Sequence, residues 1–590
     1  MVTHNSSGRM DRREFLKLGT AAAAAAAIET MGLRRALAQE SRPRRPNILF
    51  VFSDEHRWCS LPFTEMPQVV APHMERMARE GTRFDNCCST SPICVPYRGM
   101  LITGQWPHQS SCVSNDYFGN GNVIGLDSPT IAQTFKAGGY VTGYVGKWHL
   151  KSETAAHAGF DYFKHWLFGD DHWETPVRDV PSGEEFKPVK GYNAIGMTDH
   201  ALDFIRQHAG GEKPFLMMLS INPPHWRWDD APEEFVKLYP DDQLVYRPNV
   251  TQERYKKDKE RLYYQHYHAH ITAVDRELGR LMAALKELGI EDNTVLIYTS
   301  DHGSSFGSNG VGSKGNPFDE AVRVPMIVRW PGRIQAGRMA DHNIGTIDLN
   351  PTLCGLAGLK APPQCGGQDF SPVLLGKPGP DPASQLILVN NFQRNYYKTQ
   401  LDPNEPNFFY PYRGVRTKQY TYVVYAEGEW LLYDNRNDPY QMKNLVNDPA
   451  YAEVKAELRK ELDRWLARAE LPFIPDEWRE LSLPDRIARQ NRHYTLLPFV
   501  RQWNACKAEA VVPYLAQAAA AGKDRQVRAA ADQVFDEAFF GRYKALHNEL
   551  NGQKRWSKRP LDELRTELAA HEKAAADRLR AQVAQILAGG

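Results

Sequence analysis

Four apolar runs recur through the first half of the chain and constrain its fold more than any other feature. They span residues 47–53, 140–145, 214–221 and 294–300. Apolar runs of this length are typical of strands buried on both faces, as in a parallel sheet. Helical patterns lie between them, so we expect an α/β domain with a central, mostly parallel sheet.

The helical segments between these runs have clear boundaries. Residues 72–81 place Met74, Met77 and Ala78 on one face and end at Gly81, which suits a helix C-cap. A second helix is expected to open at Pro129, in its first turn, and to close at residues 138–139. Residues 267–288 repeat apolar side chains at helical spacing along one face.

The sequence changes in character at about residue 386. Short β-prone runs at 412–416, 420–425 and 429–433 predict a small antiparallel sheet, and residues 452–469 predict an amphipathic helix. Beyond residue 471 the chain is rich in Ala, Arg and Glu, with apolar stripes that indicate helices. We therefore predict a catalytic α/β domain at 46–385, a small α+β subdomain at 386–470 and a helical extension of unknown role at 471–590.

Composition excludes several classes of protein. A chain of 590 residues is too long for one compact core. Its formal net charge of +1 does not suggest a nucleic-acid partner. No segment after the N-terminus has the apolar length needed to span a bilayer. Eight cysteines are too few for a disulfide scaffold in a chain of this size.

The N-terminal segment reads as an export signal. Arg12 and Arg13 form a twin-arginine pattern, followed by an alanine-rich run and an Ala36-Leu37-Ala38 cleavage site. The alternative is an alanine-rich surface helix. We expect residues 1–38 to direct the protein through the twin-arginine export machinery to the periplasm or the extracellular space.

One motif carries the chemistry of the chain. A lone cysteine in an apolar stretch is more often a buried small hydrophobe than a nucleophile. Cys94, however, stands two residues before Pro96 and four before Arg98, and the stretch ends in Leu-Ile-Thr-Gly at 101–104. This pattern resembles the signature of the type I sulfatases, in which the cysteine is oxidised to formylglycine. Position 97 is Tyr, where Ser is common in that family.

The sulfatase resemblance implies a fold, a nucleophile and a partner. The fold would be the alkaline-phosphatase-like sandwich with a smaller C-terminal sheet domain. The hydrated aldehyde of formylglycine at Cys94 would attack the sulfur of a sulfate ester and release inorganic sulfate. A formylglycine-generating enzyme would act on Cys94 during maturation.

Acidic side chains follow two of the apolar runs. Asp54 and Glu55 end the first run, and Asp301 and His302 end the last one. Carboxylates at two strand ends of one sheet can converge on a hard cation. The resemblance assigns Asp54, Asp301 and His302 as metal ligands with the modified Cys94. Glu55 is included although Asp or Gln commonly stands there. The expected metal is Ca²⁺, and Mn²⁺ or Mg²⁺ would also suit this site.

Further polar residues match the family in order along the chain. Lys147 and His149, in Gly-Lys-Trp-His at 146–149, look like the second sulfatase signature. By resemblance Lys147 contacts the sulfate oxygens, and His149 holds the formylglycine hydroxyl and accepts its proton. His225 would protonate the leaving group, and Lys314 would bridge the sulfate and the leaving oxygen. Arg98 would neutralise and orient the modified Cys94 from one side.

These residues predict a sulfatase that acts on a sulfate ester, which we expect on a carbohydrate. Trp226, Arg227 and Trp228 follow His225 and could line a sugar-binding pocket, since tryptophan faces stack on sugars and arginine pairs with anions. Alternatively, one or both tryptophans pack in the core. The nearest alternative function is a phosphodiesterase or phosphonate monoester hydrolase of the same superfamily. A catalytically silent sulfoglycan-binding protein is a third, from a different class.

Overall fold

The computed structural model describes the chain from residue 45 to residue 471, with internal gaps, and part of the segment that follows. The gaps lie at 67, 111, 114, 116–128, 151–157, 167–171, 180–185, 251–257, 391–410 and 426–427. Residues 521–523, 526 and 530 and the helix α18 (Leu561–Ala588) are also described. The predicted signal at 1–38 and most of the predicted extension at 471–590 lie outside the described residues.

Within the described residues, ten strands form one sheet in the order β10-β2-β9-β8-β1-β7-β3-β4-β5-β6. In chain order these strands are β1 (Asn47–Ser53), β2 (Thr82–Cys88), β3 (Val141–Lys147), β4 (Tyr162–Trp166), β5 (Pro176–Asp179), β6 (Lys187–Pro188), β7 (Phe215–Ile221), β8 (Thr294–Ser300), β9 (Met326–Arg329) and β10 (Arg338–Gly345). The central strands β8, β1, β7, β3 and β4 run parallel, whereas β9, β5 and β6 pair antiparallel with their neighbours. The predicted mostly parallel sheet is confirmed.

The central strands are buried on both faces. Leu49 and Val51 of β1 belong to one hydrophobic cluster, and the alternate residues Ile48, Phe50 and Phe52 belong to another. Because successive side chains of a strand point to opposite faces, each strand serves two cores. This explains why the runs are continuously apolar rather than alternating.

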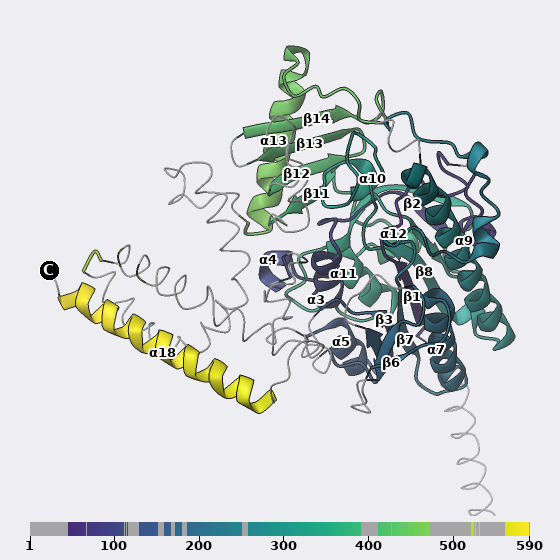
Figure 1. Ribbon diagram of the computed structural model, residues 1–590, viewed down its shortest axis with the longest axis horizontal. Helices are drawn as coiled ribbons and strands as arrows, with labels where there is room; N and C mark the ends of the chain where they lie inside the picture. Colours follow the sequence, from purple (N-terminus) through teal and green to yellow (C-terminus); the bar gives the residue numbers. More distant parts are fainter. Residues whose placement is uncertain are drawn as a thin grey trace, which may run out of the picture. The chain divides into compact units, whose positions relative to one another are not determined.

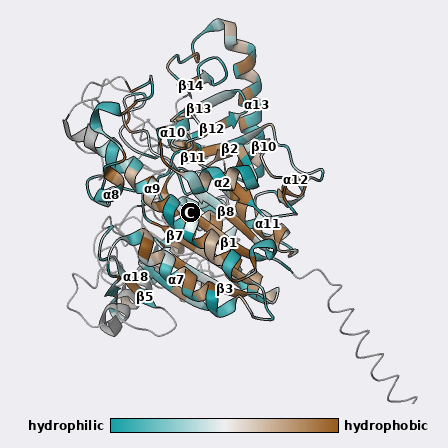
Figure 2. Cartoon of the chain, turned by 90° about the vertical axis from the view of Figure 1, so that its right-hand side faces the viewer, coloured by the Kyte–Doolittle hydropathy of each residue, from teal (hydrophilic) through white to brown (hydrophobic). Residues whose placement is uncertain are grey.

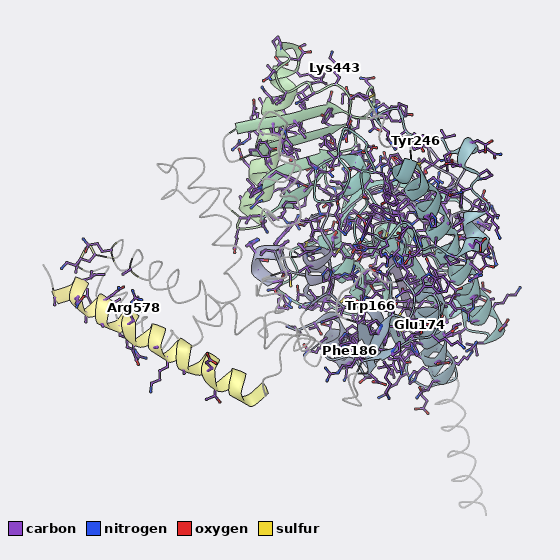
Figure 3. All side chains as sticks on the ribbon, viewed as in Figure 1. Trp166, Glu174, Phe186, Tyr246, Lys443 and Arg578 are labelled. Carbon is purple, nitrogen blue, oxygen red and sulfur yellow. The ribbon has the colours of Figure 1, made fainter. Side chains whose placement is uncertain are left out.

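Helices cover both faces of this sheet (Figure 1). The helices on one face are α2 (Pro72–Glu80), α7 (Asn193–His208) and α9 (Asp258–Glu287). The helices on the other face are α3 (Cys94–Thr103), α5 (Ile131–Ala137) and α11 (Thr346–Leu356). Along α7, hydrophobic and hydrophilic residues alternate (Figure 2), as expected for a helix with one buried face. Side chains fill the space between the sheet and its helices (Figure 3).

Short helical segments complete this region. They are α4 (Pro107–Ser110), α8 (Glu233–Val236), α10 (Asp319–Val322), α12 (Ser371–Leu374), and the 3-10 turns η1 (Asp241–Gln243) and η3 (Glu291–Asn293). In the part of the chain that the structure describes, we find no helix with the length and apolar character needed to cross a membrane.

A second sheet follows in sequence and is antiparallel, as predicted. Its four described strands are β11 (Ser384–Val389), β12 (Tyr412–Thr417), β13 (Tyr420–Tyr425) and β14 (Gly428–Asp434). After the turn η4 (Pro449–Tyr451), the helix α13 (Ala452–Arg468) lies across this sheet (Figure 1) and buries Leu458, Leu462 and Trp465 against it.

Several boundaries differ from the sequence prediction, and β3 extends to Lys147 rather than ending at residue 145. The helix α5 begins at Ile131 rather than at Pro129, because Thr130 caps it by accepting a hydrogen bond from the Gln133 amide. The helix α9 starts at Asp258, before the apolar stripe becomes regular. The strand β11 starts at Ser384, two residues before the predicted change at 386.

Candidate active site

The carboxyl ends of four adjacent strands bring the predicted site residues together. Asp54 follows β1 and Asp301 follows β8, and the last residues of these two strands, Ser53 and Ser300, are paired in register. Lys147 ends β3, which pairs with β7 on the other side of β1. Open α/β sheets place their ligand sites at this edge.

Cys94 enters the site from a helix rather than from a strand. It is the first residue of α3, and Ile93 before it is extended. The side-chain oxygen of Asn115 accepts a hydrogen bond from the Val95 amide at 2.9 Å and so holds the first turn. All residues of α3 are buried, and its N-terminal end carries partial positive charge. The cysteine sulfur is therefore fixed in position at a site that favours negative charge.

The Cys94 sulfur lies among cations and potential metal ligands. Its Sγ atom is 3.2 Å from Nε2 of His302 and 3.4 Å from Nζ of Lys314. It is 3.6 Å from Oδ1 of Asp54, and a further hydrogen bond joins it to His149. Burial alone would raise the pKa of the thiol, but the surrounding positive charges lower it well below its usual value.

The side chains of Asp54, Cys94, Asp301 and His302 form one compact group. One ligand atom from each lies within 4.8 Å of all the others, and all four residues are buried. Nδ1 of His302 donates to the Gly303 carbonyl at 2.9 Å, so Nε2 is the ring nitrogen that faces the group. Burial raises the pKa of Asp301, and the negative charge of the nearby Asp54 raises it further, to about 7. The donor set therefore fits a divalent cation.

Arg98 supports the two carboxylates from within the protein. Its Nη2 atom lies 3.0 Å from Oδ2 of Asp54 and 3.3 Å from Oδ2 of Asp301. Its Nη1 atom donates to the Ser220 hydroxyl at 2.7 Å. Its side chain also donates to the Lys147 carbonyl. The predicted role of Arg98 in neutralising and orienting the modified Cys94 stays a prediction.

Two lysines complete the charge balance of the site. Nζ of Lys147 is 2.7 Å from Oδ2 of Asp54, and Nζ of Lys314 is 4.0 Å from Oδ1 of the same carboxylate. Burial favours the protonated form of Asp54, but Lys147, His225 and Lys314 together lower its pKa well below its usual range. The site therefore holds positive charge where an anion such as sulfate would bind.

Glu55 lies outside the group of four. Its φ of 73° is in the left-handed region, and its Oε2 atom lies 3.3 Å from the Trp226 amide. The same oxygen is 3.8 Å from Nζ of Lys314 and 3.9 Å from Nε2 of His225. Glu55 is predicted as an additional metal ligand; its carboxylate lies beside Trp226, Lys314 and His225, and its role as a ligand stays a prediction.

Two histidines face the site from different loops. His149 follows β3, and burial lowers its pKa to about 4 despite its hydrogen bond with Cys94, so its ring is neutral at physiological pH. His225 follows β7, with Nε2 3.9 Å from Oδ1 of Asp54 and Nδ1 2.7 Å from the Trp226 carbonyl. Both predicted histidines are thus brought to the same edge of the sheet as Cys94.

The residues predicted to line a sugar pocket differ in exposure. Trp228 is only 9% exposed, its indole N–H donates to the Pro224 carbonyl at 2.8 Å, and its ring lies 4.3 Å from that of Phe306. Its indole packs in the core, as the alternative interpretation of this residue predicted. Trp226 is partly buried, and the side chain of Arg227 is 47% exposed.

Two supporting residues, Ser220 and Asn115, were not predicted from the sequence. Ser220 is the polar residue in the otherwise apolar strand β7, and this interruption was the signal that could have identified it. Asn115 was harder to find because it contacts α3 across 20 residues of sequence.

Comparisons with known proteins show which family this chain resembles. A family model described as Sulfatase matches residues 46–359, and one described as N-sulphoglucosamine sulphohydrolase, C-terminal, matches residues 307–468. The chain is 33% identical over 441 residues to an ulvan-active sulfatase of Formosa agariphila, covering 73% of this chain and 82% of that protein. It is 28% identical over 504 residues to an N-acetylglucosamine-6-O-sulfatase of Bacteroides thetaiotaomicron, covering 72% of this chain and 87% of that protein.

Solved structures share the fold. One, from work on the metabolism of multiple glycosaminoglycans by Bacteroides thetaiotaomicron, has a TM-score of 0.65 and 28% identity and covers 75% of this chain and 100% of its own. The phosphonate monoester hydrolase of Agrobacterium radiobacter has a TM-score of 0.58 and 22% identity, and the match covers 72% of this chain and 96% of that one. This second likeness concerns the fold alone.

Proposed function

The chain belongs to the sulfatase family of sulfuric ester hydrolases, and we propose that it hydrolyses a sulfate ester on a carbohydrate with a formylglycine derived from Cys94. The observation that carries this proposal is the convergence on the Cys94 sulfur of His302 at 3.2 Å, Lys314 at 3.4 Å and Asp54 at 3.6 Å. Two lysines and a carboxylate around a buried cysteine are typical of a reactive cysteine and not of one that only packs in the core.

Asp54, Asp301 and His302 would hold a divalent cation together with the modified residue 94. Ca²⁺ is the expected ion because the carboxylates are hard oxygen ligands, and Mn²⁺ or Mg²⁺ also suits the site. When present, the cation would supply positive charge to the sulfate oxygens, and formylglycine would supply a hydrated aldehyde oxygen as the nucleophile. Arg98 keeps the two carboxylates in position for this role.

The lysines bind the anionic group. Lys147 is buried and Lys314 is 13% exposed at its side chain, so both charges act in a poorly solvated site where electrostatic interactions are strong. Lys147 approaches from β3 and Lys314 from the loop before α10. Together they would surround the sulfate and stabilise the charge that develops as the ester bond breaks.

The histidines move protons. His149 is neutral and hydrogen-bonded to residue 94, so it can hold the formylglycine hydroxyl and accept its proton when sulfate is expelled. His225 lies near Glu55 and Asp54 and would donate a proton to the leaving oxygen. In sum, a sulfate ester and water become an alcohol and hydrogen sulfate.

Relatives and nearby residues support a carbohydrate substrate. The names of two relatives refer to ulvan and to N-acetylglucosamine. In this chain the partly buried ring of Trp226 and the exposed guanidinium of Arg227 follow His225 directly. A sugar bearing further anionic groups would find one apolar surface and one cation there.

Maturation and export are further parts of the proposal. A formylglycine-generating enzyme would convert Cys94, and Arg12 and Arg13 would then direct the folded enzyme through the twin-arginine route to the periplasm or the extracellular space. The twin-arginine route carries folded proteins, so modification in the cytoplasm would precede export.

A phosphodiesterase or phosphonate monoester hydrolase is the second candidate. The observation in its favour is the likeness of fold to a phosphonate monoester hydrolase. Lysines and a cation around a nucleophile also suit a phosphoryl group.

Two measurements test the proposal. The full chain is expressed with a formylglycine-generating enzyme, and peptide mass spectrometry across residue 94 should show loss of the thiol. Values of kcat/KM are then compared for matched aryl sulfate, phosphodiester and phosphonate substrates. Cys94→Ala should abolish turnover, and Cys354→Ala, at another buried cysteine, should retain it. A higher kcat/KM on the diester or phosphonate would favour the second candidate. An unmodified, inactive wild type would instead favour a binding protein.

A further inference from the structure

A second group of potential metal ligands lies apart from Cys94. His172, Asp230 and His270 each offer a ligand atom, and these atoms lie within 4.8 Å of one another. None of the three takes part in the proposed chemistry. They come from three segments: the stretch before β5, the loop after β7, and helix α9.

The two imidazoles face the same carboxylate oxygen. Nδ1 of His172 is 2.8 Å and Nε2 of His270 is 3.5 Å from Oδ1 of Asp230. The carbonyl oxygen of Arg227 lies 3.0 Å from the same Nε2 atom. Ligand atoms around a tetrahedral ion lie roughly 3.3 Å apart, since bonds from zinc to nitrogen or oxygen are about 2.0–2.2 Å. These spacings are close to what a small cation needs.

Other contacts hold the ligands in place. Nδ1 of His270 lies 2.6 Å from the Tyr192 hydroxyl, which fixes the ring and leaves Nε2 facing the carboxylate. The Trp173 indole donates to the Asp230 carbonyl oxygen at 2.7 Å. Both imidazoles are fully buried, whereas the Asp230 side chain is 17% exposed. An ion could therefore reach a preformed site from the carboxylate side.

Hydrogen bonding alone leaves part of this group unsatisfied. Among the described residues, the bond to Asp230 is the only hydrogen bond of the His172 ring, and its buried Nε2 has no partner. No lysine or arginine forms an ion pair with Asp230 in the part of the chain that the structure describes. A buried pair of histidines with one carboxylate is a ligand set that suits a borderline transition ion such as Zn²⁺.

We propose that His172, Asp230 and His270, with the Arg227 carbonyl, bind Zn²⁺ or a similar transition-metal cation at a site separate from the one at Cys94. Arg227 and Asp230 belong to the loop of residues 222–232 that also carries His225. A cation here would tie this loop to α9 and to the stretch before β5. The site is structural: it positions His225 and does not touch the substrate.

Metal analysis of the full chain tests the site without measuring turnover. The protein is stripped with a chelator, saturated with Ca²⁺, exposed to Zn²⁺, desalted and analysed by mass spectrometry for metals. We expect one Zn²⁺ per chain for wild type and for His208→Ala, which removes a histidine on α7. Asp230→Asn and His172→Gln should bind Zn²⁺ at least tenfold more weakly. Equal Zn²⁺ retention by wild type and these two variants would overturn the proposal.

Two further measurements use the wild-type protein, so they do not depend on whether a substituted variant folds. Added Zn²⁺ should raise the Tm of the Ca²⁺-saturated wild type, because an ion that binds only the folded state stabilises it. It should also slow cleavage by trypsin after Arg227, whose side chain is 47% exposed in the tied loop. A wild type that retains no Zn²⁺, with unchanged Tm and cleavage rate, would show that the cluster is a hydrogen-bond network only. Since no readout is turnover, failure of this site would leave the proposed sulfatase activity untouched.

Discussion

Nζ of Lys147 lies 2.7 Å from Oδ2 of Asp54, and both side chains are buried. The lysine ends β3, and the aspartate follows β1, two strands away in the sheet. Gly146 permits this approach: its φ is +117°, and a Cβ atom there would meet the Ser220 carbonyl oxygen at 1.9 Å. The position of the Lys147 charge in the candidate site thus depends on the glycine at position 146.

Lys147→Met should lower kcat by about 10²–10³-fold, the usual cost of removing one group that stabilises transition-state charge. Asp54 keeps its ion pair with Arg98, so the fold should survive. Lys164→Met, on the neighbouring strand β4, is the matched control and should keep wild-type kcat. Steady-state kinetics on an aryl sulfate measure both. If the two variants lost activity equally, Lys147 would have no special part in the reaction.

His225→Ala should affect substrates according to their leaving groups. A sulfated sugar leaves as a poor alkoxide that needs a proton, whereas nitrophenol leaves readily without one. We expect a loss of about 10²–10⁴-fold in kcat on the sugar sulfate and a much smaller loss on nitrophenyl sulfate. His208→Ala serves as the control. Uniform losses across a leaving-group series would assign His225 a structural role.

The two tryptophans after His225 should behave differently. Trp228→Ala removes a core ring packed on Phe306, so it should cost about 3–5 kcal/mol in the free energy of unfolding. Trp226→Ala should instead raise KM for a sulfated oligosaccharide more than for an aryl sulfate, with a small change in stability. Urea unfolding and kinetics on both substrates separate these effects. Equal KM changes on the two substrates would remove Trp226 from the sugar site.

The sequence predicted the strands and the site for a physical reason. Buried parallel strands need continuous apolar runs, and their carboxyl ends meet at one edge of the sheet. The sequence alone therefore predicts that Asp54 and Asp301 lie close together. Side-chain direction in the loops could not be predicted. The left-handed backbone of Glu55 and the burial of Trp228 depend on contacts with segments far away along the chain.

Contacts between segments that are far apart along the chain could not be predicted from the sequence either. His172 and Asp230 are separated by 58 residues, and neither stands in a recognisable motif. The guanidinium of Arg98 reaches Ser220 across 122 residues. Periodicity locates elements, but it does not show which loop packs against which helix.

Tyr97 replaces the common serine of the signature, and its effect can be separated into packing and maturation. Its ring lies 5.9 Å from that of Phe52, and its buried hydroxyl has no hydrogen-bond partner among the described residues. Tyr97→Phe should therefore leave the free energy of unfolding unchanged or raise it by about 1 kcal/mol. Tyr97→Ser should lower it by about 3–5 kcal/mol through the cavity it creates, while increasing the converted fraction of Cys94. Urea unfolding and peptide mass spectrometry measure the two effects, and a Phe variant less stable than wild type would contradict the packing argument.

Asp275 of α9 gives the fold a pH dependence that can be isolated. Its carboxylate accepts the His73 and Met74 amides at 3.1 and 2.7 Å, at the start of α2, whose Ala71 N-cap has no side-chain cap. Burial outweighs these bonds and raises its pKa from 3.8 to about 7. The folded state thus holds a proton that the unfolded state releases in this range, so the stabilising contribution is present at low pH and is lost as pH rises through 7.

Asp275→Asn removes this titration and should become more stable relative to wild type as pH rises from 4 to 8. The change is at most about 4 kcal/mol, since each pKa unit corresponds to about 1.36 kcal/mol. Urea unfolding at several pH values measures it, with Asp203→Asn on the exposed face of α7 as the control that should parallel wild type. A difference between Asp275→Asn and wild type that stayed constant with pH would show that Asp275 ionises in the folded protein as it does in the unfolded chain.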